Sequence, residues 1–273
     1  MDLDPPRAAN LANWESRVPV HAASQTYDLA GLAADPKRLS HVVAFDAPFL
    51  GDLTAVDAVH LQCHIGTDTL SLARLGARVT GLDFSPSALA AARDLAARAG
   101  VDITFVESEL YGAVDVLGPE RFDLVYTGIG ALCWLPDIRR WAAVVASLLR
   151  PGGRLYIRDG HPVLWATEQL EPGRLELRYP YFERGGPTRF DEAITYTDGD
   201  EIGEPVSYEW NHGLGEIVQA VLDAGLTVTR LVEHDEVDWP AYPWFEPAEG
   251  GRFRMPGDRS IVPLEYTLEA RRP

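Results

Sequence analysis

The sequence predicts an α/β protein built on a doubly wound sheet. Between residues 54 and 160, apolar stretches typical of buried strands alternate with stretches of helical period. This βαβαβ order predicts parallel strands with helices on both faces of the sheet. After residue 160 the alternation ends, which predicts a different organisation for the rest of the chain.

The elements of the alternating region follow from their residue patterns. We expect strands over 55–63, 77–83, 102–108, 121–127 and 153–159. We expect helices over 67–76, 85–100 and about 136–150, with a short segment over 111–116. The helix over 85–100 has the clearest ends, because Ser85 is a good N-cap, Pro86 fits the first turn and Gly100 fits the stop.

The second half begins with a segment of another composition. Residues 161–210 are rich in Pro, Gly, Arg and aromatic residues, which predicts an irregular or β-rich insertion. A last helix is expected over 211–225, with Asn211 as N-cap and Gly225 as its end. Strands over 226–234 and 263–272 then alternate in polarity and are expected to pair antiparallel.

Composition limits the partners and the compartment. The net charge of −17 repels phosphate groups, so we expect no nucleic acid and no anionic membrane as a partner, and a small molecule fits better. No apolar run approaches the roughly 20 residues of a membrane span, and no signal peptide is evident, so a cytoplasmic protein is expected. Cys63 and Cys133 lack metal-ligand spacing, which predicts reduced core thiols and no metal site.

The first strand-to-helix turn is the expected ligand site. In a doubly wound sheet, ligands bind outside the carboxyl ends of the strands, here beside residues 64–68. Asp83 ends the second strand 17 residues after Gly66, where a carboxylate can accept two hydrogen bonds from a ribose diol. We therefore expect an adenosine-type cofactor, with capping of the helix after Ser85 as the structural alternative for Asp83.

Four segments then identify a family. "HLQCHIG", "LDFSPSALAAAR", "RFDLVYTGIGALCWLP" and "LLRPGGRLYIRDGHP" resemble, in order, motifs of the class I S-adenosylmethionine-dependent methyltransferases. The first motif, acidic-x-Gly-x-Gly-x-Gly, places His60 at the acidic position and Gln62, His64 and Gly66 at the glycines. With "NWESRVPVH" upstream and "YEWNHGLGEIVQAVLDAGL" downstream, the chain resembles a bacterial subfamily that tolerates such a glycine-poor loop.

This resemblance implies a fold, a cofactor and an organisation. The fold is a Rossmann-like seven-stranded sheet, and the cofactor is S-adenosyl-L-methionine. The implied parts are an N-terminal helical lid (1–50), a cofactor-binding core (51–160), a substrate-facing insertion (161–210) and a C-terminal helix with an antiparallel strand pair (211–273). The implied cofactor contacts are Gln62, His64, Gly66, Asp83, Phe84, Ser85, Glu109, Leu110, Thr127, Gly128, Trp14, Arg17 and Tyr27.

Several of these residues also have a structural interpretation. Gln62 could satisfy backbone groups of the turn, and Glu109 could be a solvated acid. Arg17 and Trp14 could form a surface ion pair and a packing anchor, although a guanidinium also binds a carboxylate well.

The reaction needs an acceptor close to an activated methyl group, and a base only where the acceptor must lose a proton. His161, just after the fifth strand, is the expected base, with capping as its structural alternative. His21, Trp134, Tyr181, Trp210 and His212 are expected at the substrate, because aromatic rings stack on planar acceptors or surround cations.

The sequence therefore predicts methyl transfer to a small molecule, an aromatic or alkaloid-like secondary metabolite, at carbon, nitrogen or oxygen. A nicotinamide dehydrogenase is disfavoured because "CHIGTDT" lacks the Gly-x-Gly-x-x-Gly pattern. The alternative is a catalytically silent protein that binds S-adenosylmethionine or a metabolite and acts through a partner.

Overall fold

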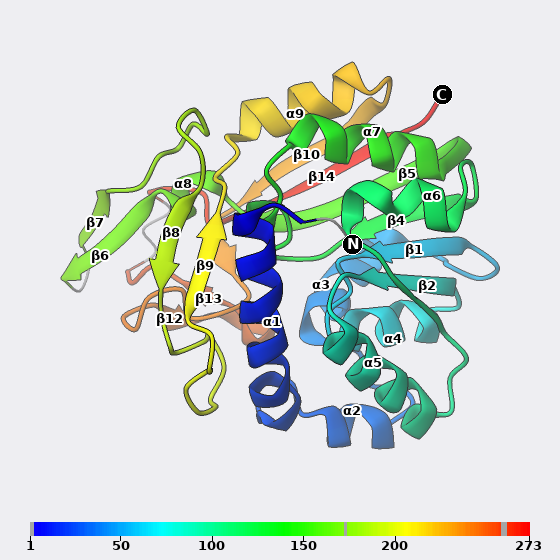
Figure 1. The fold of residues 1–273 in the computed structure, drawn as a ribbon, viewed down its shortest axis with the longest axis horizontal. Helices are drawn as coiled ribbons and strands as arrows, with labels where there is room; N and C mark the ends of the chain where they lie inside the picture. The colour runs from blue at the N-terminus through cyan, green and yellow to red at the C-terminus, as the bar shows by residue number, and fades with distance from the viewer. Residues whose placement is uncertain (1–2, 172–173, 258–260) are drawn as a thin grey trace.

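A seven-stranded sheet organises the computed structural model, which describes residues 3–171, 174–257 and 261–273 (Figure 1). Its strand order is β10-β14-β5-β4-β1-β2-β3. Strands β1 to β5 pair in parallel, whereas β14 runs antiparallel to both β5 and β10. The predicted doubly wound, Rossmann-like sheet and its antiparallel closing pair are therefore confirmed. The strands are β1 (Asp57–Leu61), β2 (Arg78–Asp83), β3 (Thr104–Glu107), β4 (Phe122–Thr127), β5 (Leu149–Gly160), β10 (Thr227–His234) and β14 (Glu265–Arg271).

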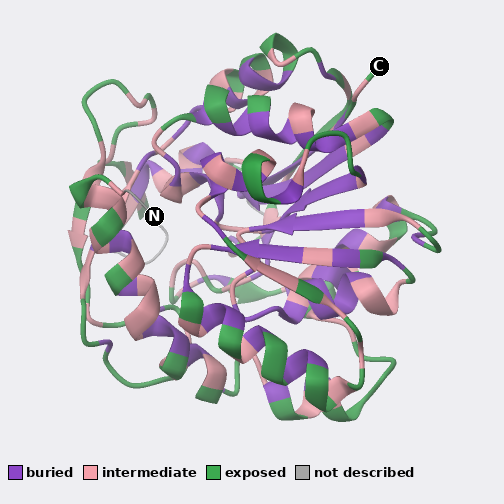
Figure 2. Ribbon diagram, turned by 45° about the vertical axis from the view of Figure 1, so that its right-hand side comes forward, coloured by how far each residue is buried: buried purple, intermediate pink, exposed green. Residues whose placement is uncertain are grey.

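Helices cover both faces of this sheet. Trp141 is fully buried in the core beneath α6, α7 and α9, while Tyr126 and Tyr156 are fully buried on the face that α3 and α4 cover. Figure 2 shows the resulting buried strands in the middle of the molecule. The helices of the first face are α6 (Ala113–Leu117), α7 (Ile138–Leu148) and α9 (Leu214–Asp223), and those of the second are α3 (His41–Leu50), α4 (Thr67–Arg74) and α5 (Pro86–Ala99).

Helix ends follow their capping residues. The hydroxyl of Ser85 accepts the Ala88 N–H at the start of α5, and Gly100 ends that helix with a φ of +68°, as predicted. The expectation for the last helix is wrong at its start, because α9 begins at Leu214 with Gly213 as N-cap. Asn211 instead donates its side-chain amide to the carbonyls of two prolines and so ties together segments of the insertion.

The N-terminal helices and the insertion pack together at the carboxyl edge of the sheet. The side chains of Asn10 and Asn13 in α1 hydrogen-bond the backbone of Tyr208 and Glu204, so α1 lies along β9 (Figure 1). These outer elements are α1 (Pro5–Ala23), α2 (Leu29–Ala34), α8 (Pro162–Trp165), β6 (Thr167–Glu171), β7 (Arg174–Leu177), β8 (Thr188–Asp191) and β9 (Val206–Glu209). A further small sheet follows, of β11 (Glu236–Val237), β12 (Glu246–Pro247) and β13 (Phe253–Arg254).

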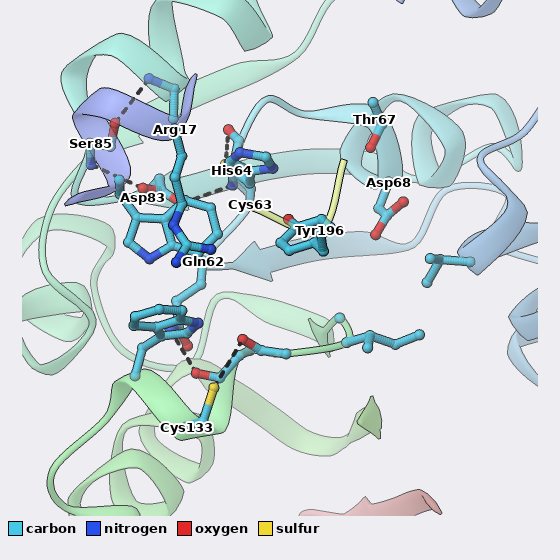
Figure 3. Close-up of a pocket in the computed structure, with 18 of the residues that line it drawn as sticks. Arg17, Gln62, Cys63, His64, Thr67, Asp68, Asp83, Ser85, Cys133 and Tyr196 are labelled. Carbon is cyan, nitrogen blue, oxygen red and sulfur yellow. Dashed lines mark hydrogen bonds between the residues drawn. The ribbon is translucent and has the colours of Figure 1, made fainter. Parts of the chain in front are cut away.

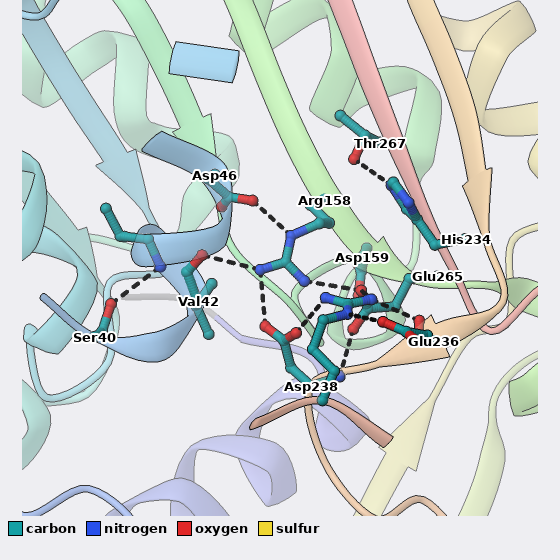
Figure 4. A network of polar contacts seen from close by, with 12 residues as sticks. Ser40, Val42, Asp46, Arg158, Asp159, His234, Glu236, Asp238, Glu265 and Thr267 are labelled. Atoms are coloured by element: carbon teal, nitrogen blue, oxygen red, sulfur yellow. Dashed lines mark hydrogen bonds and ion pairs between the residues drawn. The ribbon is translucent and has the colours of Figure 1, made fainter. Parts of the chain in front are cut away.

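A buried network of charges connects this last sheet to the core (Figure 4). The guanidinium of Arg158 on β5 bonds Asp46 at 2.6 Å, Glu265 at 2.8 Å and Asp238 at 2.8 Å. Arg252 also pairs with Asp238 and Glu265. The network therefore joins α3, β5, β14 and the chain between β11 and β13.

Candidate functional site

The turn between β1 and α4 has the backbone conformation that glycine usually provides. Gln62 and His64 have φ values of +56° and +50°, although both carry side chains. The His64 N–H donates to Asp83 Oδ2 at 2.8 Å, and Gln62 Nε2 donates to the Ala131 carbonyl at 3.0 Å. The side-chain oxygen of Gln62, Oε1, is buried and has no hydrogen-bond partner among the described residues.

Gly66 has a packing role in the structure. It precedes α4 with a φ of +80°, and a Cβ at this position would lie 2.7 Å from the Cβ of Ala92 in α5. Gly66 does not line the cavity described next, which contradicts the expected direct contact with a cofactor. Glycine is needed here because α4 and α5 approach each other closely.

A cavity of about 970 Å³ lies at the carboxyl ends of β1, β2 and β4, between the sheet, α1 and the insertion (Figure 3). Most of the predicted cofactor residues line it, and so does one predicted substrate residue. These residues are Trp14, Arg17, Tyr27, Gln62, His64, Asp83, Phe84, Ser85, Glu109, Leu110, Gly128 and Trp134.

Asp83 is the buried acid of this cavity. Its carboxylate accepts the N–H groups of His64 and Ser85 at 2.8 and 2.9 Å, and Asp83 lines the cavity. The N-cap of α5 is Ser85, so the structural alternative that Asp83 caps this helix is wrong. Burial raises the pKa of Asp83 to about 6, and the backbone donors oppose this rise. Desolvation has the larger effect at this side chain.

Arg17 gives the cavity a buried cation. Its guanidinium carbon lies 5.3 Å from the ring centroid of Trp14 and 5.6 Å from that of Trp134. Its Nε donates to Asn13 Oδ1 at 2.7 Å, and no carboxylate within the described ranges forms an ion pair with it. The rings and Asn13 therefore hold the guanidinium in place at the cavity wall.

Two histidines form a neutral pair beside Arg17. The Nδ1 of His21 lies 3.2 Å from Nε2 of His64, and Nε2 of His21 lies 2.7 Å from Thr195 Oγ1. Burial, and then the charge of Arg17, lowers the pKa of His21 to about 3, and burial lowers that of His64 well below its usual value. His21 does not line the cavity, so it supports His64 from behind and is not placed at a substrate.

The expected base is outside the cavity. Nδ1 of His161 accepts the Val163 N–H at 3.1 Å and caps α8, while its Nε2 lies 3.0 Å from Glu233 Oε1 on β10. The ring lies against β10 rather than among the residues that line the cavity, and the catalytic role of His161 stays a prediction. Asp159, also at the end of β5, accepts backbone N–H groups of residues 130 and 132 and so positions the loop after β4.

Four other predicted residues also lie outside the cavity. His212 Nε2 bonds the Leu135 carbonyl at 2.7 Å, and the Tyr181 hydroxyl accepts the N–H of Leu214 at 3.2 Å. The substrate contacts expected of both residues stay predictions. Trp210 and Thr127 are buried in the fold, one beside η2 (Leu132–Trp134) and the other at the end of β4.

The structure adds cavity residues that no motif indicates. Asp68 follows the glycine-poor turn, and Glu209 ends β9 in the insertion. Cys133 is half-buried and lines the cavity, which corrects its expected place in the core. No local pattern in the four-residue strand β9 singles out Glu209 in the sequence.

Metal chemistry and a membrane span have no support in the described parts of the chain. No group of three or more His, Cys, Asp or Glu side chains there is arranged to hold a metal ion. No helix within the same ranges is both long and apolar enough to cross a bilayer.

Comparison with known proteins agrees with this geometry. Residues 59–155 match a family model described as a methyltransferase domain. An uncharacterized protein from Synechococcus sp. is 32% identical over 197 residues, which cover 71% of this chain and 40% of that protein. A ubiquinone biosynthesis O-methyltransferase from Serratia proteamaculans is 31% identical over 155 residues, covering 55% of this chain and 62% of that enzyme. The chain thus spans less than two thirds of either curated relative.

A solved structure shows the same fold. The S-adenosylmethionine-dependent methyltransferase from Mesorhizobium loti superposes with a TM-score of 0.54 at 23% identity, covering 82% of this chain and 94% of that one. The fold class uses S-adenosylmethionine as its cofactor. Residues 59–155 thus match a methyltransferase-domain model, and the chain has the seven-stranded fold of the solved S-adenosylmethionine-dependent methyltransferase.

Proposed function

We propose that the protein transfers a methyl group from S-adenosylmethionine to a small aromatic molecule. The observation that carries this proposal is the place of Asp83, a buried carboxylate that ends β2 and lines a cavity of about 970 Å³. Ligand pockets commonly measure about 300 to 1,000 Å³, so this cavity has room for a nucleoside cofactor and a second small molecule.

The side chains present fit the cofactor. Asp83 would bind the ribose, and Leu110 and Phe84 provide apolar surface for the adenine. The unpartnered oxygen of Gln62 offers a buried acceptor, and Arg17 offers a fork of donors for the amino acid carboxylate. S-adenosylmethionine, when bound, supplies an electrophilic methyl group on a positively charged sulfur.

The rest of the cavity favours a planar acceptor. Aromatic rings from α1, η2, the insertion and the chain around β13 line it, and such rings bind planar molecules by stacking. The kinship with a ubiquinone biosynthesis O-methyltransferase also supports a small-molecule acceptor. The aromatic residues are Trp14, Trp134, Trp165, Tyr196, Trp239 and Phe253.

Calorimetry with S-adenosylhomocysteine tests the cofactor site. Asp83→Asn should raise its Kd by about 10-fold or more, because a hydrogen bond to a charged group contributes about 1.5–3 kcal/mol. Asp94→Asn is the matched control, since Asp94 is exposed on α5 and pairs only with Arg98 at 3.2 Å. Absence of binding to the wild type, or equal Kd values for the wild type and Asp83→Asn, would overturn the proposal.

Turnover separates an enzyme from a silent binding protein. The protein is mixed with S-adenosylmethionine and a panel of indoles, phenols and amines. Mass spectrometry should then detect a product about 14 mass units heavier than its acceptor, the mass of one CH₂ group, as expected for methyl transfer to a small molecule. Binding without any methylated product, on this panel and on non-aromatic compounds, would support the silent protein instead.

A further inference from the structure

Glu209 is a carboxylate at the cavity wall with neither a hydrogen bond nor an ion pair among the described residues. It is the last residue of β9, it is half-buried and it lines the cavity. No hydrogen bond or ion pair reaches its side chain from the parts of the chain that the structure describes. Burial of an unpaired charge is costly, so such a group is retained where a ligand compensates it.

The backbone around Glu209 is held firmly. The Trp210 N–H donates to the Cys133 carbonyl at 2.8 Å, which fixes the end of β9 against η2. The side chain of Asn10 bonds both the N–H and the carbonyl of Tyr208 at 2.8 Å. Glu209 is therefore positioned beside the Trp134 segment by contacts on both sides.

The charges that line the cavity leave an excess of carboxylate. Partners within the fold already bond several of its acids, namely Asp83 by backbone amides, Glu109 by Arg7, Asp198 by Thr26 and Asp238 by Arg158. Asp68, Glu192 and Glu209 remain without an ion pair among the described residues. Of the three arginines that line the cavity, Arg7 and Arg38 pair with Glu109 and Asp28, and Arg17 has no ion pair within the same residues. A cationic ligand would restore the balance.

We propose that Glu209 binds the methyl acceptor and that this acceptor is an arylalkylamine, an aliphatic amine attached to an aromatic ring, held as its ammonium between the carboxylate and the nearby indole of Trp134. The inference rests on the proposed methyl transfer and names its substrate class. Trp binds cations on its ring face, and a carboxylate forms a charge-assisted hydrogen bond with an ammonium. An acidic acceptor would be repelled by Glu209, and a neutral alcohol would leave its charge unpaired.

The same carboxylate can handle the proton. The Glu209 carboxylate takes one proton from the bound ammonium, which leaves a neutral amine and a carboxylic acid. The nitrogen lone pair then forms the bond to the methyl carbon, while the carbon–sulfur bond breaks and both its electrons stay on sulfur. The products are an N-methylammonium, S-adenosylhomocysteine and protonated Glu209, which releases its proton to water.

The electrostatic surroundings of Glu209 suit this role. Burial raises the pKa of Glu209 to about 7; the charge of Arg17 from α1 opposes this rise, and that of Glu192 from the insertion adds to it. A group that titrates near neutral pH can both accept and release a proton there. The sign of the pH effect follows, since the carboxylate form is lost, and with it amine binding, as the pH falls through about 7.

Two sets of probes test the inference on protein saturated with S-adenosylhomocysteine. The first set is tyramine, tyrosol and 4-hydroxyphenylacetate, and the second is tryptamine, tryptophol and indole-3-acetate. Within each set the ring is constant and only the amine, alcohol or acid changes. Calorimetry should give the lowest Kd for the amine, and Glu209→Gln should raise that Kd by about 10-fold while leaving the Kd of the alcohol unchanged.

Glu192→Gln is the matched control, because it removes the same charge from an exposed side chain at the cavity rim and should change the amine Kd much less. With S-adenosylmethionine, tyramine should yield the N-methyl product. The inference would be overturned by an O-methyl product, by a lower Kd for the alcohol or the acid than for the amine, or by binding of none of the six probes. It would also be overturned if the amine still had the lowest Kd in the Glu209→Gln variant. Failure of the wild type to bind S-adenosylhomocysteine would overturn the proposed function itself.

Discussion

At the scale of single residues, the turn after β1 shows how a backbone conformation can persist without its usual residue type. Gln62 and His64 occupy the left-handed region, at a cost of about 1–2 kcal/mol each relative to glycine. At Gln62, the hydrogen bond from the side chain to the Ala131 carbonyl offsets part of this cost. The side chains also bring polar atoms into the cavity that two glycines would lack.

The position of His161 leads to a prediction about catalysis. His161→Gln should leave turnover per folded molecule unchanged, because the ring caps α8 and contacts Glu233 outside the cavity. Stability should fall by about 1 kcal/mol, the usual effect of losing an N-cap. Thermal unfolding and an initial-rate assay on the same preparation check both statements. A large loss of turnover with unchanged stability would restore His161 as a base.

At the scale of elements, the close approach of α4 and α5 depends on the absence of a side chain at Gly66. Gly66→Ala should destabilise the protein by about 1–3 kcal/mol more than Gly100→Ala does. Both glycines have φ values near +70° to +80°, but only at Gly66 does a Cβ meet a neighbour, the Cβ of Ala92 at 2.7 Å. Chemical denaturation of the two variants measures the difference, and equal losses would show that the close approach is unimportant.

The sequence predicted the elements of the sheet well because their signals are local. The apolar period of each strand or helix lies within that element, and the cap at Ser85 adjoins the helix that it begins. Parallel strands also bring their carboxyl ends to one edge of the sheet. Asp83 and Glu109 could therefore be placed at the site in advance. His161 could not, because the chain turns into α8 directly after β5 and directs the ring toward β10. Glu209 reaches the cavity only through the packing of β9 on α1, for which the sequence has no periodic signal.

At the scale of the whole molecule, the Arg158 network connects parts of the chain that are distant in sequence. Arg158→Met should lower the free energy of unfolding by about 3–5 kcal/mol, because Asp46 loses its buried ion pair, and Asp238 and Glu265 keep only their pairs with Arg252 among the described residues. Arg139→Met is the control and should cost less than about 1 kcal/mol, since Arg139 pairs with Asp223 in solvent. Urea titration of both variants measures the two losses in the free energy of unfolding. Similar losses for Arg158→Met and Arg139→Met would mean that the buried carboxylates take up protons when Arg158 is removed.

The place of β14 in the sheet has a consequence for synthesis on the ribosome. Residues 265–271 are made after every other strand, yet they lie between β5 and β10. Until they leave the exit tunnel, β5 presents a bare edge, β10 has no neighbour to join, and Arg158 lacks Glu265. A chain that lacks these residues exposes an aggregation-prone strand edge, and the same seven residues both complete the sheet and bring Glu265 to the buried guanidinium.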